Sequence, residues 1–422
     1  MTESENLDPE VVQKAKKVKK AALKAALLSA EDRIRILNAM ADAIEEKRDE
    51  IKRVNQKDVD AGREKGLSDA LIDRLILNDK RISSMCQGLR DVARMDDELG
   101  DITEMWKRPN GLRIGKMVVP LGVISIIYES RPNVTVDAAG LCVKSGNVIL
   151  LRGGSEAINS NVYLANLISN AAIANGFPEG GIEIIEKTDR SSVNALFKMH
   201  DYIDVLIPRG SAGFIKHVVN NSSIPVIETG AGNCHTYVDK NADLKMALEM
   251  VYNGKVQRPS VCNATKKVLV HKDVAEEFLP QVRKKLGVAK VIFLVDQKAK
   301  KYFPNSELMP PELWYEEFLD MRLGVKIVDT IDEAIDHINE YNSKHTEAII
   351  TRDYDRALKF INSIDAAALN WNASTRFTDG GQYGIGAEIG ISTQKIHARG
   401  PMSVQQLTTS KYVVFGTGQI RE

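Results

Sequence analysis

The sequence has few of the features that mark secreted, membrane or metal-binding proteins. Its 422 residues include only four cysteines, Cys86, Cys142, Cys234 and Cys262, and no two form a C-x-x-C pair. That spacing argues against a disulfide framework and a zinc site, and it fits a reducing compartment. No apolar run reaches the roughly 20 residues that a membrane-spanning helix needs. The polar, acidic start does not resemble a secretory signal. We therefore expect a cytoplasmic protein with no membrane partner.

The chain also lacks a net charge. Lys+Arg and Asp+Glu both total 57, so nothing in the balance favours nucleic acid or an anionic membrane as a partner. The seven histidines are scattered without a metal-binding spacing, so we expect no metal. Apolar residues make up 43% and charged residues 27%, which is ordinary for a globular protein. A chain of this length exceeds one hydrophobic core, so we expect two or three domains.

A change of hydrophobic period divides the chain. Residues 8–95 carry apolar positions at helical spacing only. From residue 122, short apolar strands alternate with helical stretches and Gly-containing loops. That alternation predicts an α/β fold with parallel sheets covered by helices on both faces. A Pro-Asn-Gly turn within 105–119 predicts a hairpin, which suits an interface arm and an ordinary surface hairpin equally well. Near the end, 411–415 reads as a further peripheral strand.

The strand and helix pattern predicts two successive α/β series. In the first, the predicted strands are 122–128, 147–152, 182–185, 203–208 and 225–228, with helices at 155–174, 191–199 and 211–220. In the second, the predicted strands are 267–270, 291–295, 347–351 and 366–370, with helices at 246–256, 273–286, 331–341 and 353–363.

Two strand-to-helix turns suit a nucleotide cofactor. Arg152-Gly153-Gly154-Ser155-Glu156 follows one predicted strand, at the place where doubly wound sheets bind nucleotides. Its glycines allow close approach, its helix start attracts phosphate, and Arg152 would favour a 2′-phosphorylated cofactor. The alternative is a tight turn without a ligand.

Gly210 and Ser211 open the second such turn, after the strand at 203–207. A helix start in this context suits the pyrophosphate. Neither turn is specific alone, but two at strand ends predict a nucleotide site better than one.

Cys262 lies in the segment 257–264, between a basic residue and an amide and ahead of an apolar strand. A thiolate is a strong nucleophile once a cation or helix N-terminus lowers its pKa. About thirty residues earlier, Glu228 precedes Thr-Gly-Ala-Gly. Such a carboxylate acts as a general base, positions water, or simply caps a helix or forms an ion pair. We expect the other three cysteines to be buried small hydrophobes.

Polar loops follow two of the predicted strands, at 128–133 and 370–377. Arg131, Ser374 and Arg376 in these loops supply the guanidinium and hydroxyl groups that an anionic, amino-acid-like substrate requires. A solvated turn is the equal alternative for each loop alone.

Together these motifs resemble the aldehyde dehydrogenase superfamily: a carboxylate in a Gly-rich turn, then a cysteine, on an α/β chain without G-x-G-x-x-G. The resemblance runs from about residue 8 through nearly the whole chain. Its longest matches lie at 128–135, 257–264, 372–377 and 386–401. Within the superfamily the chain most resembles the enzymes that reduce L-glutamyl 5-phosphate.

The resemblance implies roles for individual residues. Cys262 matches the nucleophile, Glu228 the acid of the Glu-Leu-Gly-Gly motif, and Glu317 the acid that holds the nicotinamide ribose, although the usual Phe-Gly-Pro after it is missing. The usual Pro-Trp-Asn is also replaced. If that loop bends differently from the one in relatives, Asn133 stabilises the oxyanion. The other role implied for this loop is that Arg131 binds the substrate phosphate. The cofactor-binding residues implied are Arg152, Gly153, Ser155, Glu156, Gly210, Ser211 and Glu317, and the substrate-binding residues are Arg131, Arg258, Ser374 and Arg376.

The implied reaction is the NADPH-dependent reduction of L-glutamyl 5-phosphate to L-glutamate 5-semialdehyde and phosphate, through a Cys262 thioacyl intermediate, in proline biosynthesis. Glutamate 5-kinase would hand over the substrate, and the enzyme would form a homo-oligomer. The implied domains are a cofactor domain (1–104 and 120–233), a catalytic domain (234–402) and an oligomerisation arm (105–119 and 403–422). The alternatives are a hydrolytic or CoA-acylating aldehyde dehydrogenase and a non-catalytic oligomeric scaffold.

Overall fold

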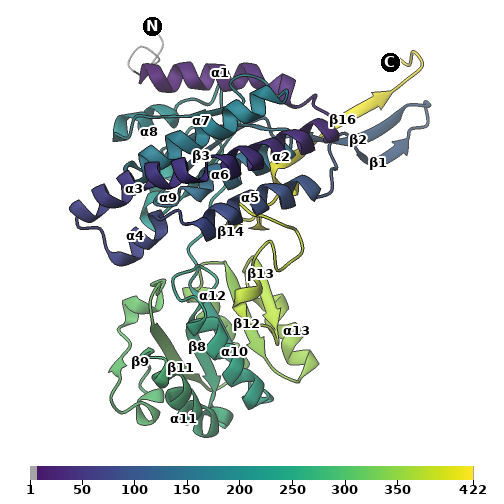
Figure 1. Cartoon of the computed structure of the whole chain (residues 1–422). Helices are drawn as coiled ribbons and strands as arrows, with labels where there is room; N and C mark the ends of the chain where they lie inside the picture. Colours follow the sequence, from purple (N-terminus) through teal and green to yellow (C-terminus); the bar gives the residue numbers. More distant parts are fainter. Residues whose placement is uncertain (1–6, 422) are drawn as a thin grey trace. The chain divides into compact units, whose positions relative to one another are not determined.

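The structure is a computed structural model that describes residues 7–421, and the chain in it divides into two compact units (Figure 1). Unit 1 holds the chain through Glu228, then Ile385–Gly390, and the part from Met402 onward. Unit 2 holds Thr229–Gly384 and Ile391–Pro401. The chain thus first passes between units at 228/229, beside the boundary predicted at 233/234. The residues of the predicted arm belong to unit 1. Residues 1–6 of the predicted cofactor domain and residue 422 of the predicted arm lie outside the part of the chain that the structure describes.

The N-terminal region is helical, as the apolar spacing predicted. Each helix buries one apolar stripe, and α2 begins with a reciprocal capping box between Ser29 and Asp32. The helices are α1 (Pro9–Ala25), α2 (Ala30–Glu46), α3 (Arg48–Glu64), α4 (Asp69–Leu75) and α5 (Asp79–Arg94).

A four-stranded parallel sheet with the order β5-β4-β3-β6 forms the centre of unit 1. Its strands are β3 (Val123–Tyr128), β4 (Val148–Gly153), β5 (Ile182–Ile184) and β6 (Val205–Arg209). The helices between and after them are α6 (Asn133–Lys144), α7 (Ile158–Ala174), α8 (Arg190–Leu196) and α9 (Ala212–Asn221), with a 3-10 turn at Ser155–Ala157. β3 is buried along its whole length, as expected for a strand covered on both faces.

The strand predicted at 225–228 is wrong. Only Val226 forms a bridge there, to Leu206 of β6. The Leu206 N–H donates to the Pro225 carbonyl, and the Ile227 N–H donates back to the Leu206 carbonyl. Pairing stops after this exchange because the chain leaves unit 1 at Glu228.

Unit 2 is built on a seven-stranded parallel sheet with the order β10-β9-β11-β8-β7-β12-β13. The strands are β7 (Cys234–Val238), β8 (Thr265–His271), β9 (Ile292–Val295), β10 (Glu307–Leu308), β11 (Arg322–Val328), β12 (Thr346–Ile350) and β13 (Ala368–Trp371). Alternate side chains of β8 divide the core. Val268 and Val270 pack with α10 (Leu244–Val256) and α11 (Lys272–Val288), whereas Leu269 packs with α12 (Ile331–Tyr341) and α13 (Tyr354–Ser363).

Sequence patterns missed β7, in which His235 and Thr236 interrupt the apolar residues, and β11, whose alternating Arg322, Gly324 and Lys326 hide its apolar run. Short elements complete the two units: 3-10 turns at Ala299–Tyr302 (η3), Pro311–Trp314 (η4), Thr375–Phe377 (η5) and Gln405–Leu407 (η6), and the pair β14 (Ile391–Ser392) and β15 (Gly400–Pro401).

The predicted hairpin is confirmed and carries a third strand. β1 (Ile102–Lys107) and β2 (Arg113–Pro120) pair antiparallel, and β16 (Thr408–Phe415) pairs with the other edge of β2 along eight residues. β1 and β16 are therefore the outer strands of this ribbon. Two parallel α/β sheets with a small β ribbon match the predicted fold class. Over the described residues, no helix is both long and apolar enough to span a bilayer.

Candidate active site

Cys262 lies in the turn between α10 and β8, at the amino end of that strand, and is partly exposed. The other three cysteines are buried, which confirms their prediction as small core residues. Burial raises the pKa of Cys86 to about 11. It also raises the pKa of Cys142 and Cys234 well above the ordinary value. Those thiols therefore stay protonated, and Cys262 is the accessible sulfur.

The Gly-rich segment predicted from sequence packs directly on the cysteine turn. A Cβ added to Gly232 would lie 1.8 Å from the Cys262 carbonyl oxygen, so only glycine fits. The Gly232 N–H donates to Glu317 Oε1 at 2.7 Å. The Cys234 thiol donates to the same Cys262 carbonyl at 3.2 Å. The structure thus brings Glu317 and Cys262 against one glycine.

Lys266 is a functional candidate that sequence reasoning missed. Its ammonium Nζ donates to the carbonyls of Val261 and Cys262, at 2.6 and 2.8 Å. The side chain is fully buried. Consecutive lysines at the start of a strand that is otherwise apolar are rarely buried without a partner. The pair Lys266-Lys267 in an apolar strand was therefore the one sign in the sequence that these lysines are buried.

Arg376, a predicted substrate residue, is fixed to the cysteine turn at two points. Its guanidinium donates to Asn263 Oδ1 and, from Nε at 3.0 Å, to Gln257 Oε1. Burial and then the charge of Arg258 lower the pKa of Arg376, while Cys262 opposes the change. Two guanidinium groups near Cys262 favour an anionic reactant.

Ser374, also predicted to bind substrate, uses its hydroxyl within the protein. Oγ donates to Asn253 Oδ1 at 2.8 Å and accepts the Arg376 N–H at 3.4 Å. It therefore caps the short helix η5 that carries Arg376. A direct contact with substrate remains a prediction.

Lys267 extends from β8 toward the segment that carries Glu317. Its Nζ donates to Asn233 Oδ1 at 2.8 Å and to the Glu316 carbonyl, and it lies 3.8 Å from the centre of the Phe318 ring. Burial lowers the pKa of Lys267 to about 7. Adjacent lysines of one strand thus support two different parts of the site.

Six of the seven predicted cofactor residues lie at the carboxyl edge of the sheet in unit 1, whereas Glu317 belongs to unit 2. Ser211 caps α9 through its side chain, as a helix start requires. A Cβ on Gly210 would lie 2.6 Å from Glu129 Oε2, which also accepts the Ser211 N–H at 3.2 Å. A carboxylate of the protein therefore lies where we predicted the pyrophosphate.

Glu156 performs a similar function at the neighbouring turn. Its Oε1 accepts the N–H of Ser130 and, at 2.8 Å, the Ser130 hydroxyl. Ser130 adopts φ 48°, a left-handed backbone that these two bonds support. A Cβ on Gly153 would lie 2.1 Å from Asn161 Nδ2. Contacts within the protein thus explain why Gly153 and Gly210 have no side chain. Their role toward a cofactor remains a prediction.

Arg152 lies at the end of β4, beside the loop that follows β5. Its Nη2 donates to the carbonyls of Thr188 and Asp189, at 2.7 and 3.2 Å. Burial lowers its pKa, and the carboxylates of Glu156, Asp189 and Glu129 oppose that change. Two backbone carbonyls thus hold the guanidinium, and acidic side chains lie near it. Its contact with a 2′-phosphate remains a prediction.

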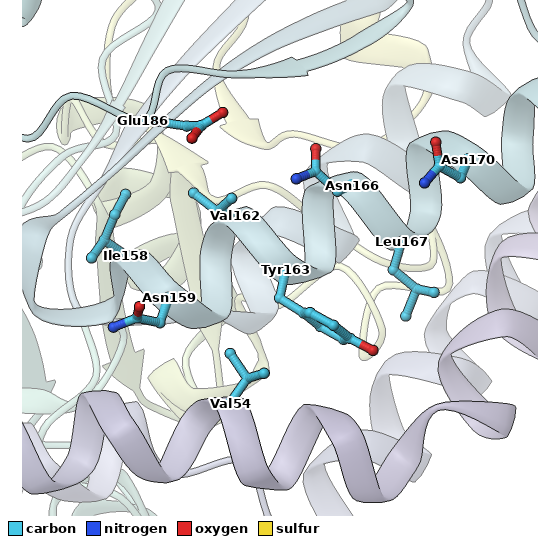
Figure 2. A pocket seen from close by; sticks show the side chains of 9 residues that line it. All are labelled: Val54, Ile158, Asn159, Val162, Tyr163, Asn166, Leu167, Asn170 and Glu186. Carbon is cyan, nitrogen blue, oxygen red and sulfur yellow. The ribbon is translucent and has the colours of Figure 1, made fainter.

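A groove with a volume of 610 Å³ runs along α7, starting just after the turn at 152–156 (Figure 2). Val54 of α3, Val162 and Leu167 supply apolar walls, and three asparagine amides of α7 supply polar groups. The lining residues are Val54, Ile158, Asn159, Val162, Tyr163, Asn166, Leu167, Asn170 and Glu186.

Asn133 begins α6, and its Nδ2 donates to Asp137 Oδ2 at 2.8 Å. Burial raises the pKa of Asp137 to about 6, opposed by the Asn133 amide and by Arg209. Asn133, Arg131 and Glu228 belong to unit 1, whereas Cys262 belongs to unit 2. Their predicted roles beside the cysteine therefore remain predictions. In residues 7–421, no group of three acids, histidines or cysteines could hold a metal ion.

Comparison with known proteins places this geometry in a family. The aldehyde dehydrogenase family model matches residues 2–296. Gamma-glutamyl phosphate reductase of Halothermothrix orenii is 54% identical over 413 residues, which cover 98% of this chain and 99% of that protein. The enzyme of the same name from Petrotoga mobilis is 54% identical over 416 residues, covering 99% and 100%. The crystal structure of gamma-glutamyl phosphate reductase from Thermotoga maritima has a TM-score of 0.95 and 46% identity, covering 98% of this chain and 100% of that one.

These findings confirm the predicted resemblance and the fold class. The parallel α/β scaffold is shared with reductases of this family, which implies a nicotinamide cofactor. The chain therefore belongs to the aldehyde dehydrogenase family, related over nearly its whole length to the gamma-glutamyl phosphate reductases.

Proposed function

We propose that this chain reduces L-glutamyl 5-phosphate to L-glutamate 5-semialdehyde and phosphate, with NADPH as the cofactor and Cys262 as the nucleophile. The observation that carries the proposal is the turn around Cys262, where an accessible thiol lies near the guanidinium groups of Arg376 and Arg258. A thiolate and an acyl phosphate are both anions, so these cations stabilise the attacking group and the substrate alike. The names of the full-length relatives support the choice of substrate.

The first step forms a bond between Cys262 Sγ and the acyl carbon, and the bond from that carbon to the phosphate oxygen breaks. Phosphate leaves with the electron pair, beside Arg376 and Arg258. The oxyanion formed during attack needs hydrogen-bond donors in fixed positions. We assign these to the Cys262 backbone N–H and to the Asn133 amide. Arg131 is our further candidate for the substrate phosphate.

The residues at the edge of unit 1 suit a dinucleotide phosphate. Arg152 supplies a cation, and the start of α9 supplies N–H groups. Gly153, Ser155, Glu156 and Gly210 shape the two turns. In unit 2, Glu317 would hold ribose hydroxyls beside Cys262. Bound NADPH supplies the hydride that converts the thioester to the aldehyde level. Hydrolysis of the thioester would waste substrate, so Glu228 is assigned to positioning and proton transfer.

One assay tests this function against its alternatives. In the reverse direction, glutamate 5-semialdehyde should reduce NADP⁺ only when phosphate is present, because phosphate must release the thioacyl group. Reduction without phosphate would instead indicate a hydrolytic enzyme. A requirement for CoA would indicate the CoA-acylating class, and failure to bind NADPH would indicate a scaffold.

Assembly forms a second part of the proposal. The ribbon β1-β2-β16 exposes large apolar side chains on its outer strands, among them Trp106, Tyr412, Val414 and Phe415. Its outer strands have edges able to pair with another chain. We infer a homo-oligomer, most simply a dimer, in which β16 extends the partner's sheet. Light scattering tests this inference, and a strict monomer at micromolar concentration would refute it. Truncation after Thr409 should lower both the oligomeric order and the activity.

The cellular setting follows from the substrate. An acyl phosphate hydrolyses readily, so direct hand-over from glutamate 5-kinase in the cytoplasm would protect it. Co-elution of the two purified enzymes, or a transient time shorter than free diffusion allows, would support that arrangement.

A further inference from the structure

Lys266 lies beneath the cysteine turn with its side chain fully buried. It is the second residue of β8, four positions after Cys262. Its Nζ donates to the Val261 carbonyl at 2.6 Å and to the Cys262 carbonyl at 2.8 Å. One cation therefore binds the two peptide groups that flank the Cys262 Cα.

These two contacts matter because a peptide group is rigid and planar. The Val261 carbonyl and the Cys262 N–H belong to the same peptide group. A donor on the carbonyl fixes the direction of that N–H, and polarisation along the group strengthens it as a donor. The contact to the Cys262 carbonyl fixes the second peptide group in the same way. Together they hold the Cα from which the sulfur projects.

We propose that Lys266 is a positioning residue for the reaction: it aims and strengthens the Cys262 N–H that meets the oxyanion, and its charge favours the Cys262 thiolate. The oxyanion part rests on the proposed function, whereas the thiolate part can be tested without any substrate. No contact between Lys266 and the reactant is required, because Lys266 acts through the backbone of the nucleophile.

The surroundings of Lys266 fit a charged role. Burial lowers the pKa of Lys266, while Cys234, Glu317 and Cys262 favour its protonated form and Arg376 opposes it. These groups come from β7, the segment after η4, the cysteine turn and η5. A buried cation costs free energy unless it is paired. Here two carbonyls accept hydrogen bonds from Lys266, and the negative charges of Glu317 and the Cys262 thiolate favour its protonated form.

Two neighbouring lysines show that burial alone does not create this arrangement. Lys267, the next residue on β8, bonds to Asn233 and the Glu316 carbonyl instead. Lys255 of α10 is also fully buried, and its Nζ has no hydrogen-bond partner among the described residues. Burial lowers the pKa of Lys255 to about 7. Lys255 is therefore the matched control: a buried lysine of the same unit whose ammonium makes no hydrogen bond to the turn.

The experiment compares Lys266→Met, Lys266→Arg and Lys255→Met with the wild type. Alkylation of Cys262 by iodoacetamide is followed against pH by mass spectrometry, with cofactor and substrate absent. Steady-state kcat and KM are measured in parallel. For Lys266→Met we expect the alkylation midpoint to rise by about one pH unit or more, a tenfold loss of thiolate. We expect kcat to fall by at least about tenfold, and by less than the roughly 10²–10³ that complete loss of an oxyanion donor costs, because the Cys262 N–H is weakened but still present; KM should change less than about threefold.

The controls separate positioning from general stabilisation. Lys255→Met should keep the wild-type alkylation midpoint, and Lys266→Arg should restore much of the midpoint because it retains the charge. An unchanged midpoint and kcat in Lys266→Met would overturn the proposal, as would an equal effect in Lys255→Met. If Lys266→Met does not fold, Lys266→Gln replaces it with the same expected direction. If the wild type fails the phosphate-dependent assay, the proposed function fails, and the alkylation profile still decides whether Lys266 activates Cys262.

Discussion

The cysteine turn of unit 2 and the carboxyl edge of the sheet in unit 1 differ in the sign of the charges that they present. Around Cys262, the protein supplies cations: Lys266 holds the turn, and Arg376 is bonded to it. At the edge of unit 1, Glu129 and Glu156 already accept the backbone N–H groups of Ser211 and Ser130. The turn is thus preset for a thiolate and an acyl phosphate. At the edge, by contrast, a cofactor phosphate bound as we propose would compete with carboxylates of the protein.

The largest expected effect breaks the cysteine side of this comparison. Cys262→Ala should abolish turnover and leave NADPH affinity nearly unchanged, because the thiol acts in covalent chemistry and not in binding. Loss of a nucleophile normally removes several orders of magnitude in rate. Steady-state assays and fluorescence titration with NADPH measure the two quantities. Activity above about one hundredth of wild type would disprove the covalent role, since a remaining rate of that size exceeds what binding groups alone supply.

The next effect concerns the cations of the turn. Arg376→Ala should lower kcat/KM for the acyl phosphate by about 10–100-fold, since a charge-assisted hydrogen bond contributes roughly 1.5–3 kcal/mol. Arg258→Ala should have a smaller effect, because Arg258 is exposed and Arg376 is bonded to the turn. Kinetics with varied phosphate in the reverse direction measure both. An equal loss in a substrate without a phosphate would assign these arginines to folding of the turn.

A third variant tests the acidic edge of unit 1. Arg152→Ala should weaken NADPH by roughly 1.5–3 kcal/mol and NADH by less, if the guanidinium meets the 2′-phosphate. Titration of both cofactors under one set of conditions gives the ratio. Because Arg152 also bonds the carbonyls of Thr188 and Asp189, an equal loss for both cofactors would show that it acts by holding the loop after β5.

The sequence predicted most of the fold because its hydrophobic period changes where the architecture changes. The helices of 8–95, the hairpin at 105–119 and most strands were readable in this way. β7 and β11 were missed because polar residues interrupt them. The segment 225–228 was taken for a strand because a short apolar run does not reveal how far its pairing extends.

The site was readable only in part. A motif selected Cys262 and the family resemblance selected Glu317, and both residues contact Gly232 in the structure. Lys266 was missed because a lysine in a strand carries no sign of its partners until the turn folds back onto it. The packing of Glu129 against Gly210 was equally invisible, since it joins the ends of two strands far apart in the chain. Motifs report which residue types are present, whereas long-range contacts decide which charges neutralise one another.

The smallest expected effect appears in the pH dependence of stability, where the two units should again differ. The pKa of Asp137 is raised from 3.8 to about 6 by burial, so the folded protein binds this proton more tightly than the unfolded chain. Its contribution to stability is present below about pH 4 and is lost as the pH rises to 6. Lys255 and Lys267 in unit 2 have pKa values lowered to about 7. There, stability should increase as the pH rises from 7 toward 10, because the unfolded chain holds the extra protons.

Asp137→Asn isolates the term from unit 1. Asparagine can still accept the Asn133 amide hydrogen bond, so the variant removes the titration and keeps the contact. Relative to wild type, the variant should gain stability between pH 4 and 6, and the difference should stay constant above pH 6. One pKa unit corresponds to about 1.4 kcal/mol, and because the side chain is partly exposed we expect a gain of about that size or less. Urea unfolding of both proteins at several pH values measures the difference. A difference that does not vary between pH 4 and 6 would show that the Asp137 carboxyl titrates alike in the folded and unfolded chain, and that the edge of unit 1 does not resist negative charge at this position.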